Sequence, residues 1–363
     1  MHPFLQAIQD SGISGTTKEL YFRNLKTIAT LTGKSDLSFI FKPNKTYKII
    51  EKHWPNIQTR RSVIIAIKSI FRHLPELKCQ HLRASERWHE LYSTLHTAMV
   101  DRVMRGEPTD RERRNWVRWK DVVEKERELA RTEYASQRHL LLAMYTLIEP
   151  GRQDYHAVAL YNDYPRDMTT GNFVVIPLDA NAPATLVLNE YKTKKSYGQY
   201  IRTLPMPLTK IIHESLRQRP RFHLFAKQEN GEPHVDRHVF TRYVNNELER
   251  LFEKRFTVGM MRHSFISEGV DYNKSTPGQL FQTAANMHHS IAQQQQYRRQ
   301  VPPTGEETSD DDDDDDDGDI SVSMEPSPKE IAPPVKAAKP ATKPTKAAEK
   351  KPPPPPGYID VSI

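Results

Sequence analysis

The sequence predicts a mainly α-helical protein with one small antiparallel β-sheet, an α+β fold in two domains that is followed by a disordered tail. Three observations lead to this prediction. Apolar residues recur at helical spacing through much of the chain, a β-rich stretch interrupts them at 172–204, and foldable composition ends near Gln300. A chain of 363 residues, 37% of them hydrophobic, has room for two domains with ordinary cores.

Residues 1–100 are predicted to form a helical domain. Thr16 and Glu19 have the spacing of a capping box, which favours a helix start ahead of Leu20. A second helix, with Thr59 as a candidate cap, carries an apolar stripe at helical spacing. The members of this stripe are Val63, Ile67, Ile70, Phe71 and Leu74.

The opposite side of this second helix is basic. Arg61, Lys68 and Arg72 fall within about 40° of one another when successive residues are placed 100° apart. We interpret this side either as a DNA-binding surface that lies along phosphates or as an ordinary solvated charged face.

A charged segment at 101–115, which contains glycine and proline, is predicted to link this domain to a second one at 116–300. Trp116 and Trp119 are interpreted as core residues at the start of the second domain, ahead of a helical run. β-rich runs are expected at 172–176, 185–191 and 198–204, and helices around 208–217, 236–252 and 260–268.

Residues 301–363 have the composition of a disordered, acidic and then Lys/Pro-rich tail. Asp310 to Asp317 are consecutive acids, and 13 of the 27 prolines lie after residue 300. The tail holds 7 Lys/Arg and 15 Asp/Glu, so the other 300 residues hold 46 and 31, a net charge of +15. A body this basic indicates a polyanionic partner such as nucleic acid, although a merely soluble basic protein is the alternative.

The composition also argues against several kinds of site. Cys79 is the only cysteine, which excludes an internal disulfide framework and a Cys-based zinc site and fits a reducing intracellular compartment. No apolar run is long enough for a membrane span, so we expect a soluble protein with no membrane partner. Gly33-Lys34-Ser35 looks like the end of a phosphate loop, but Ile28 occupies the position of its first glycine. We therefore expect neither a metal nor a cofactor.

Four motifs follow one another between residues 150 and 297. They are Pro150-Gly151-Arg152-Gln153-Asp154-Tyr155, the predicted hairpin at 189–198 with Lys192, Thr257-Val258-Gly259-Met260-Met261-Arg262-His263-Ser264-Phe265, and the run from Met287 and His288 to Tyr297. Two arginines can clamp one phosphodiester through forked hydrogen bonds, while a tyrosine hydroxyl attacks phosphorus to give a covalent phosphotyrosine. Each motif alone is weak evidence, whereas their order and spacing together are specific.

These motifs resemble those of the tyrosine recombinase and integrase family. The run that ends at Tyr297 is similar to the family's GHSSIATTQxY sequence, and the run around Arg262 is similar to its HxLRHSF box. The resemblance implies a helical core-binding domain before a catalytic domain. It also implies that Arg152 and Arg262 are catalytic arginines, that Lys192 is the general acid, that His288 bonds the phosphate and that Tyr297 is the nucleophile. Lys194 and Lys195 remain alternatives to Lys192.

The same resemblance suggests a function. The Pro-x-Arg-x-Asp-Tyr form is closest to integrases of eukaryotic mobile elements and large DNA viruses. We therefore expect a site-specific recombinase that integrates such an element into double-stranded DNA, as a dimer on each site and a tetramer in the synapse. The host nucleus or the site of viral DNA replication is the expected location. One position departs from the family pattern, because Gly259 stands where most relatives have a histidine. A type IB topoisomerase and an inactive DNA-binding relic are the alternatives.

Overall fold

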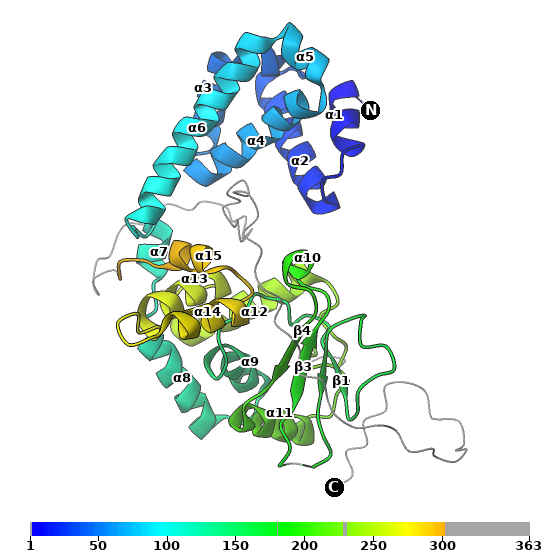
Figure 1. Ribbon diagram of the computed structural model, residues 1–363, viewed down its shortest axis with the longest axis vertical. Helices are drawn as coiled ribbons and strands as arrows, with labels where there is room; N and C mark the ends of the chain where they lie inside the picture. The colour runs from blue at the N-terminus through cyan, green and yellow to red at the C-terminus, as the bar shows by residue number, and fades with distance from the viewer. Residues whose placement is uncertain (1, 180, 228–230, 302–363) are drawn as a thin grey trace. The chain divides into compact units, whose positions relative to one another are not determined.

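The computed structural model describes residues 2–179, 181–227 and 231–301, and within them it shows a largely helical protein with one four-stranded sheet (Figure 1). This confirms the predicted α+β class. The chain divides into two compact units, Met1–Glu107 and Pro108–Ile363. The predicted disordered tail lies outside the described residues, apart from its first residue.

All described elements of the first unit are helical. They are α1 (Pro3–Gln9), α2 (Gly15–Thr32), the 3₁₀ helix η1 (Ser38–Phe41), α3 (Pro43–His53), α4 (Ile57–His73), α5 (Pro75–Gln80) and α6 (Leu82–Met104). Helix α4 packs against α1, α2 and α6 and is the centre of this unit. Val63, Ile67 and Ile70 are fully buried on it, which confirms the predicted apolar stripe. Trp88 on α6 is also buried, and its indole N–H donates to the carbonyl oxygen of Ile40 at 2.7 Å.

Two helix starts differ from those predicted. Helix α2 is capped by Ser14 and not by Thr16, since the Ser14 hydroxyl accepts from the backbone N–H of Thr17 at 3.4 Å. Helix α4 is capped by Asn56, whose amide oxygen accepts from the backbone N–H of Thr59 at 3.4 Å. Ser14 and Asn56 both have the extended backbone that an N-cap requires, whereas the predicted cap residues already lie inside the helices.

Helix covers most of the segment predicted to be a linker at 101–115. Helix α6 continues to Met104, and α7 (Asp110–Asn115) begins after Thr109. Thr109 and Glu112 form a capping box, in which each side chain bonds the other's backbone N–H. This reciprocal bonding stabilises a helix that the charged composition alone did not indicate.

The second unit contains eight further α-helices of varied length and one π-helix in its described part. They are α8 (Trp119–Thr132), α9 (Gln137–Thr146), α10 (Lys194–Tyr197), α11 (Met206–Gln218), α12 (Arg237–Phe252), α13 (Val258–Ser264), the π-helix η2 (Phe265–Gly269), α14 (Pro277–Asn286) and α15 (Ile291–Tyr297).

The sheet of the second unit has the order β1 (Ala159–Tyr161), β2 (Phe173–Val175), β3 (Thr185–Leu188), β4 (Tyr200–Thr203). Strands β2, β3 and β4 are antiparallel neighbours, as predicted. The sheet also has an edge strand that was not predicted. This strand, β1, runs parallel to β2.

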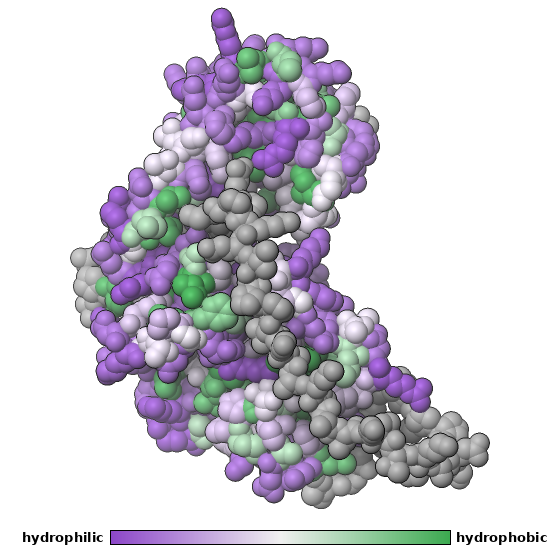
Figure 2. All heavy atoms as spheres, viewed as in Figure 1, coloured by the Kyte–Doolittle hydropathy of each residue, from purple (hydrophilic) through white to green (hydrophobic). Residues whose placement is uncertain are grey.

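Side chains alternate between the two faces of this sheet. Leu160, Val174 and Leu186 belong to the main core that α9 and α11 share, while Phe173 and Val187 form a separate small cluster. On the face of the molecule shown in Figure 2, hydrophilic residues predominate over the described surface, and hydrophobic residues occur in small patches.

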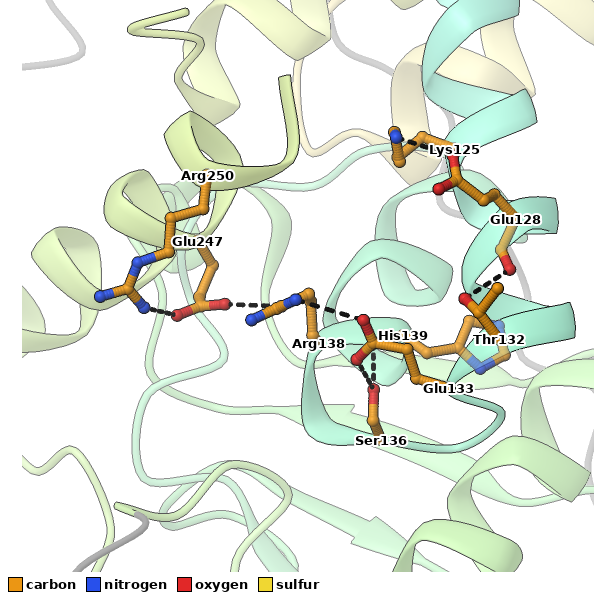
Figure 3. Close-up of polar contacts among 9 residues, drawn as sticks. All are labelled: Lys125, Glu128, Thr132, Glu133, Ser136, Arg138, His139, Glu247 and Arg250. Atoms are coloured by element: carbon orange, nitrogen blue, oxygen red, sulfur yellow. Dashed lines mark hydrogen bonds and ion pairs between the residues drawn. The ribbon is translucent and has the colours of Figure 1, made fainter. Parts of the chain in front are cut away.

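Ion pairs tie α9 to α12. Arg138 on α9 donates to Glu247 on α12 at 3.0 Å and to Glu133 at 3.2 Å, and Glu247 also pairs with Arg250 at 2.6 Å (Figure 3). Because Glu247 is buried and accepts from two arginines, the contact restrains both helices. Helix α9 leads into the segment at 150–155, so this pairing helps to fix where that segment lies.

Candidate active site

Arg262 occupies the centre of the candidate site and is 1% exposed. It lies on α13, where the Thr257 hydroxyl caps the helix by accepting from the Met260 N–H at 3.3 Å. Its Nη1 donates to the carbonyl oxygen of Pro150 at 3.0 Å, and both terminal nitrogens lie 3.5 Å from the carbonyl oxygen of Met287. Arg262 thus joins the segment that carries Arg152 to the segment that carries His288.

Arg152 is also buried, in the segment between α9 and β1. Its charge acts on His288, Asp154 and Tyr197. Burial raises the pKa of Asp154, and the positive charges of Arg237 and Arg152 oppose that rise. Arg237 lies 3.3 Å from the Asp154 carboxylate, so Asp154 is an ion-pair partner at the edge of the site.

His288 lies in the turn between α14 and α15, is 4% exposed and has a φ of 57°, in the left-handed region. Its ring lies 4.7 Å from that of Tyr191 and 4.2 Å from that of Tyr200. Among the described residues, neither of its ring nitrogens has a hydrogen-bond partner.

The environment of His288 keeps its imidazole neutral. Burial lowers its pKa to about 3, and the charges of Arg262, Arg152 and Arg202 act in the same direction. A neutral imidazole has one N–H donor and one acceptor nitrogen. The structure therefore brings Arg152, Arg262 and His288 together and leaves His288 able to donate one hydrogen bond.

Tyr297 is the last residue of α15 and is buried in a small cluster with Ile266 and Met287. The guanidinium carbon of Arg262 lies 4.8 Å from the centre of its ring. His263 lies beside the ring at 4.8 Å, and its Nδ1 donates to the Tyr297 carbonyl oxygen at 2.7 Å. Tyr297 therefore contacts Arg262 directly.

His289, which the sequence motifs did not single out, contacts both Arg262 and Tyr297. Its ring stacks on that of Tyr297 at 5.3 Å, and its Nδ1 lies 3.1 Å from Nη2 of Arg262. A guanidinium only donates, so Nδ1 of His289 is the acceptor and the proton of the neutral ring is on Nε2. Adjacent residues of a helix point to different faces, but the turn at His288 buries both side chains.

Lys192 lies in the connection between the antiparallel strands β3 and β4, just before α10. The Tyr191 hydroxyl donates to the Gly198 carbonyl oxygen at 2.8 Å and closes this connection. The Thr193 hydroxyl donates to the His288 carbonyl oxygen at 3.3 Å, so the residue next to Lys192 contacts the site. The side chain of Lys192 is itself exposed, as are those of the two alternatives, Lys194 and Lys195.

Gly259 is the second residue of α13. A Cβ atom built there would meet only the Thr257 hydroxyl oxygen within 4 Å, at 3.6 Å, which is an ordinary contact. Steric crowding at Cβ therefore does not require glycine at the position where most members of the resembled family have a histidine.

The predicted DNA-binding face on α4 needs correction. Arg61 is 4% exposed, with its guanidinium carbon 5.4 Å from the centre of the Tyr92 ring of α6. Lys68 lies over the same ring, at 3.7 Å, and its Nζ is 3.1 Å from Nδ1 of His89. Arg72 is exposed. Helix α6 covers Arg61, whereas Lys68 is half-buried, so Arg61 does not form an open surface with Lys68 and Arg72.

Two searches within the described residues gave negative results. No group of three or more His, Cys, Asp and Glu side chains among them is arranged to hold a metal ion. None of the described helices is long and apolar enough to cross a membrane.

Neither a scan against protein-family models nor a search of curated proteins found a match to this chain. Among solved structures, the chain is similar to the crystal structure of XerA recombinase, with 14% sequence identity and a TM-score of 0.36 over 82% of this chain and 91% of that chain. A similarity at this level establishes neither a shared fold nor a shared activity, so the function is inferred from the residues themselves.

Proposed function

We propose that this protein cuts and rejoins DNA through a covalent 3′-phosphotyrosine at Tyr297. One observation carries the proposal. The guanidinium of Arg262 lies against the Tyr297 ring at 4.8 Å and donates to the carbonyl of Pro150, two residues before Arg152. Two arginines, a neutral histidine and a tyrosine from four separate segments thus meet around one buried centre.

The proposed reaction uses each of these groups. Arg152 and Arg262 neutralise the phosphodiester, whose negative charge on oxygen grows in the transition state. The Tyr297 hydroxyl oxygen forms a bond to phosphorus as the bond between phosphorus and the 5′ oxygen breaks. Lys192 gives its proton to the departing 5′ oxygen, which would otherwise leave as an unstable alkoxide. The reverse sequence, with a 5′ hydroxyl as the attacking group, reseals the strand.

The role of His288 in this scheme is to bind the phosphate. With its pKa lowered to about 3, it is neutral and offers a ring N–H to a phosphate oxygen. The phenol of Tyr297 must also lose its proton as its oxygen bonds to phosphorus. Gly259 has no side chain to accept this proton, and we propose a water as the acceptor.

The biological context is part of the proposal. A net charge of +15 on the first 300 residues favours double-stranded DNA as the partner. Arg72 remains a candidate phosphate contact in the first unit, while buried Arg61 does not. Integration of a viral or mobile element, by a dimer on each DNA site and a tetramer in the synapse, is the function that the sequence motifs favour. The host nucleus or the site of viral DNA replication is the proposed location.

Substitution of Tyr297 by phenylalanine tests the chemistry. The variant should bind DNA as the wild type does but form no denaturant-resistant protein–DNA adduct, because only the nucleophilic oxygen is lost. A library of random-sequence duplexes, incubated with each protein and recovered as covalent adducts, measures this and identifies the target sequence. An adduct with Tyr297→Phe would assign the nucleophile to another residue.

The same preparations separate the two alternatives. Relaxation of a supercoiled plasmid without exchange of strands between DNA molecules would identify a type IB topoisomerase. DNA binding by the wild-type protein without any adduct would identify an inactive relic, for which Gly259 is the supporting observation.

A further inference from the structure

A buried carboxylate on α7 contacts the residues that flank Tyr297. Glu112 is 9% exposed and uses both of its carboxylate oxygens. Oε2 accepts from the backbone N–H of Thr109 at 2.6 Å, which completes the capping box of α7. Oε1 accepts from Nε of Arg299 at 3.2 Å and lies 3.5 Å from Nε2 of His263.

Arg299 and His263 in turn hold the end of α15. His263 Nδ1 donates to the Tyr297 carbonyl oxygen at 2.7 Å, and Nη1 of Arg299 donates to the Gln296 carbonyl oxygen at 2.6 Å. The Arg299 backbone N–H donates to the Ser267 hydroxyl at 2.8 Å. The last carbonyls of a helix have no partner within it, and here the side chains of His263 and Arg299 satisfy two of them.

The charges in this cluster depend on one another. A carbonyl oxygen only accepts, so Nδ1 of His263 carries a proton, and Nε2 faces a carboxylate to which it can also donate. Burial acts to raise the pKa of Glu112. The charges of His263 and Arg299, with the hydrogen bonds from Thr109, outweigh this effect and lower it overall. The Glu112 carboxylate is therefore the group that contacts both of the side chains that hold the end of α15.

We propose that Glu112 is a positioning residue for Tyr297, because it anchors the two side chains that fix the end of α15 and so sets where the phenol lies relative to Arg262. This inference rests on the proposed nucleophilic role of Tyr297. Glu112 does not touch the reacting atoms in this proposal. Its effect is geometric, and a displacement of about 1 Å at a reacting group can cost on the order of 100-fold in rate.

Glu112→Gln in the full-length protein is the direct test. Glutamine has a similar size and keeps an oxygen for the Thr109 N–H, but it lacks the charge that holds Arg299 and His263. We expect the single-turnover rate of adduct formation to fall about 10- to 100-fold on duplexes that the wild type recovers as adducts. The affinity for random duplex should not change. Glu124→Gln is the matched control, since Glu124 pairs at the exposed surface of α8, with Arg131 at 3.1 Å and Arg127 at 3.5 Å.

A double substitution distinguishes anchoring from a general loss of packing. If Glu112 acts through Arg299, then Glu112→Gln with Arg299→Gln should be little slower than the slower single variant. If the fold-reductions of the two single variants multiply in the double variant, the two residues act separately, and that result overturns the proposal. An unchanged rate in Glu112→Gln, with an active wild type, overturns it as well.

Hydrogen exchange separates this inference from the proposed function. In the absence of DNA, Glu112→Gln should exchange the backbone amides of α15 several-fold faster than the wild type does. The amides of α9 should be unchanged, which also shows that the variant is folded. Unchanged exchange in α15 refutes the anchoring role whatever the activity. Faster exchange in α15 together with an inactive wild type would support the anchor and refute the proposed chemistry.

Discussion

Removal of the buried histidine in the candidate site should change how stability depends on pH. The pKa of His288 is lowered to about 3 from an ordinary value of 6.5, first by burial and then by the charges of Arg262, Arg152 and Arg202. Between these two values the unfolded chain binds a proton that the folded protein does not bind. The contribution of His288 is therefore complete above pH 6.5 and is lost as the pH falls toward 3.

The size of the effect follows from the two pKa values. Each unit of pKa difference corresponds to about 1.4 kcal/mol. On going from pH 7 to pH 5, the unfolded histidine becomes almost fully protonated while the folded one stays neutral. The folded state thus loses about 2 kcal/mol relative to a protein without this histidine. This loss of stability does not depend on the exact pKa of His288 in the folded state, provided that this pKa lies well below 5.

His288→Asn is a suitable variant, because asparagine tolerates the left-handed backbone at this position. Denaturant-dependent hydrogen exchange of α9 at pH 7 and pH 5 measures the stability of the second unit alone. The wild type should lose about 2 kcal/mol more than the variant between these pH values, and a control, His238→Asn at an exposed position, should behave as the wild type does. An equal loss in the wild type and His288→Asn would mean that His288 is not kept neutral by the fold.

Five further substitutions test individual contacts. Gly259→Ala should raise the free energy of unfolding by about 0.5–1 kcal/mol, because its Cβ meets only one atom, at 3.6 Å, and alanine favours a helix. Gly269→Ala should lower it by roughly 1–3 kcal/mol, because its Cβ would lie 2.8 Å from two aromatic rings; denaturation of both variants checks the opposite signs, and equal signs would contradict the packing. Arg61→Met should leave the salt dependence of random-duplex binding unchanged, whereas Arg72→Met should reduce its slope if Arg72 contacts a phosphate, and the reverse order would restore Arg61 as a DNA contact. Lys192→Ala should be slow on an ordinary substrate and nearly normal on one with sulfur at the 5′ bridging position, since a thiolate leaves without a proton; equal defects on both substrates would move the acid role to another lysine.

The sequence was most informative where side-chain period determines burial. The stripe of α4 and the three antiparallel strands were predicted because a repeated pattern over several residues leaves few alternatives. Arg61 shows the limit of such reasoning. A helical wheel identifies the side opposite the core stripe, but it does not show that a second helix, α6, covers that side. A central helix has more than one covered face, so a basic residue can be buried against an aromatic ring.

His289 shows a different limit. Neighbouring residues diverge on a helix or strand, so the motif that contains His288 gives no sign that His289 belongs to the same site. A left-handed residue in a turn breaks that rule, and histidine gives little sign that it will adopt this conformation. The Glu112 contacts were equally hidden, because Arg299 lies 187 positions away in the sequence. The α7 capping box was missed because the segment was interpreted as a charged linker, and its link to α15 depends on tertiary packing alone.

The hydrogen bonds of Arg262 have a consequence for how a phosphate enters the site. A guanidinium has five N–H groups, and its four terminal ones are directed at the carbonyls of Pro150 and Met287 and at His289. Among the described residues, its Nε–H has no partner. A phosphate that takes two parallel hydrogen bonds must therefore displace a carbonyl, and that of Met287, with both contacts at 3.5 Å, is the weakest competitor. A phosphate oxygen would then replace the Met287 carbonyl oxygen as a hydrogen-bond acceptor of Arg262. Because His288 follows Met287 directly, the turn that carries His288 would be held less tightly by Arg262 in the occupied site than in the empty one.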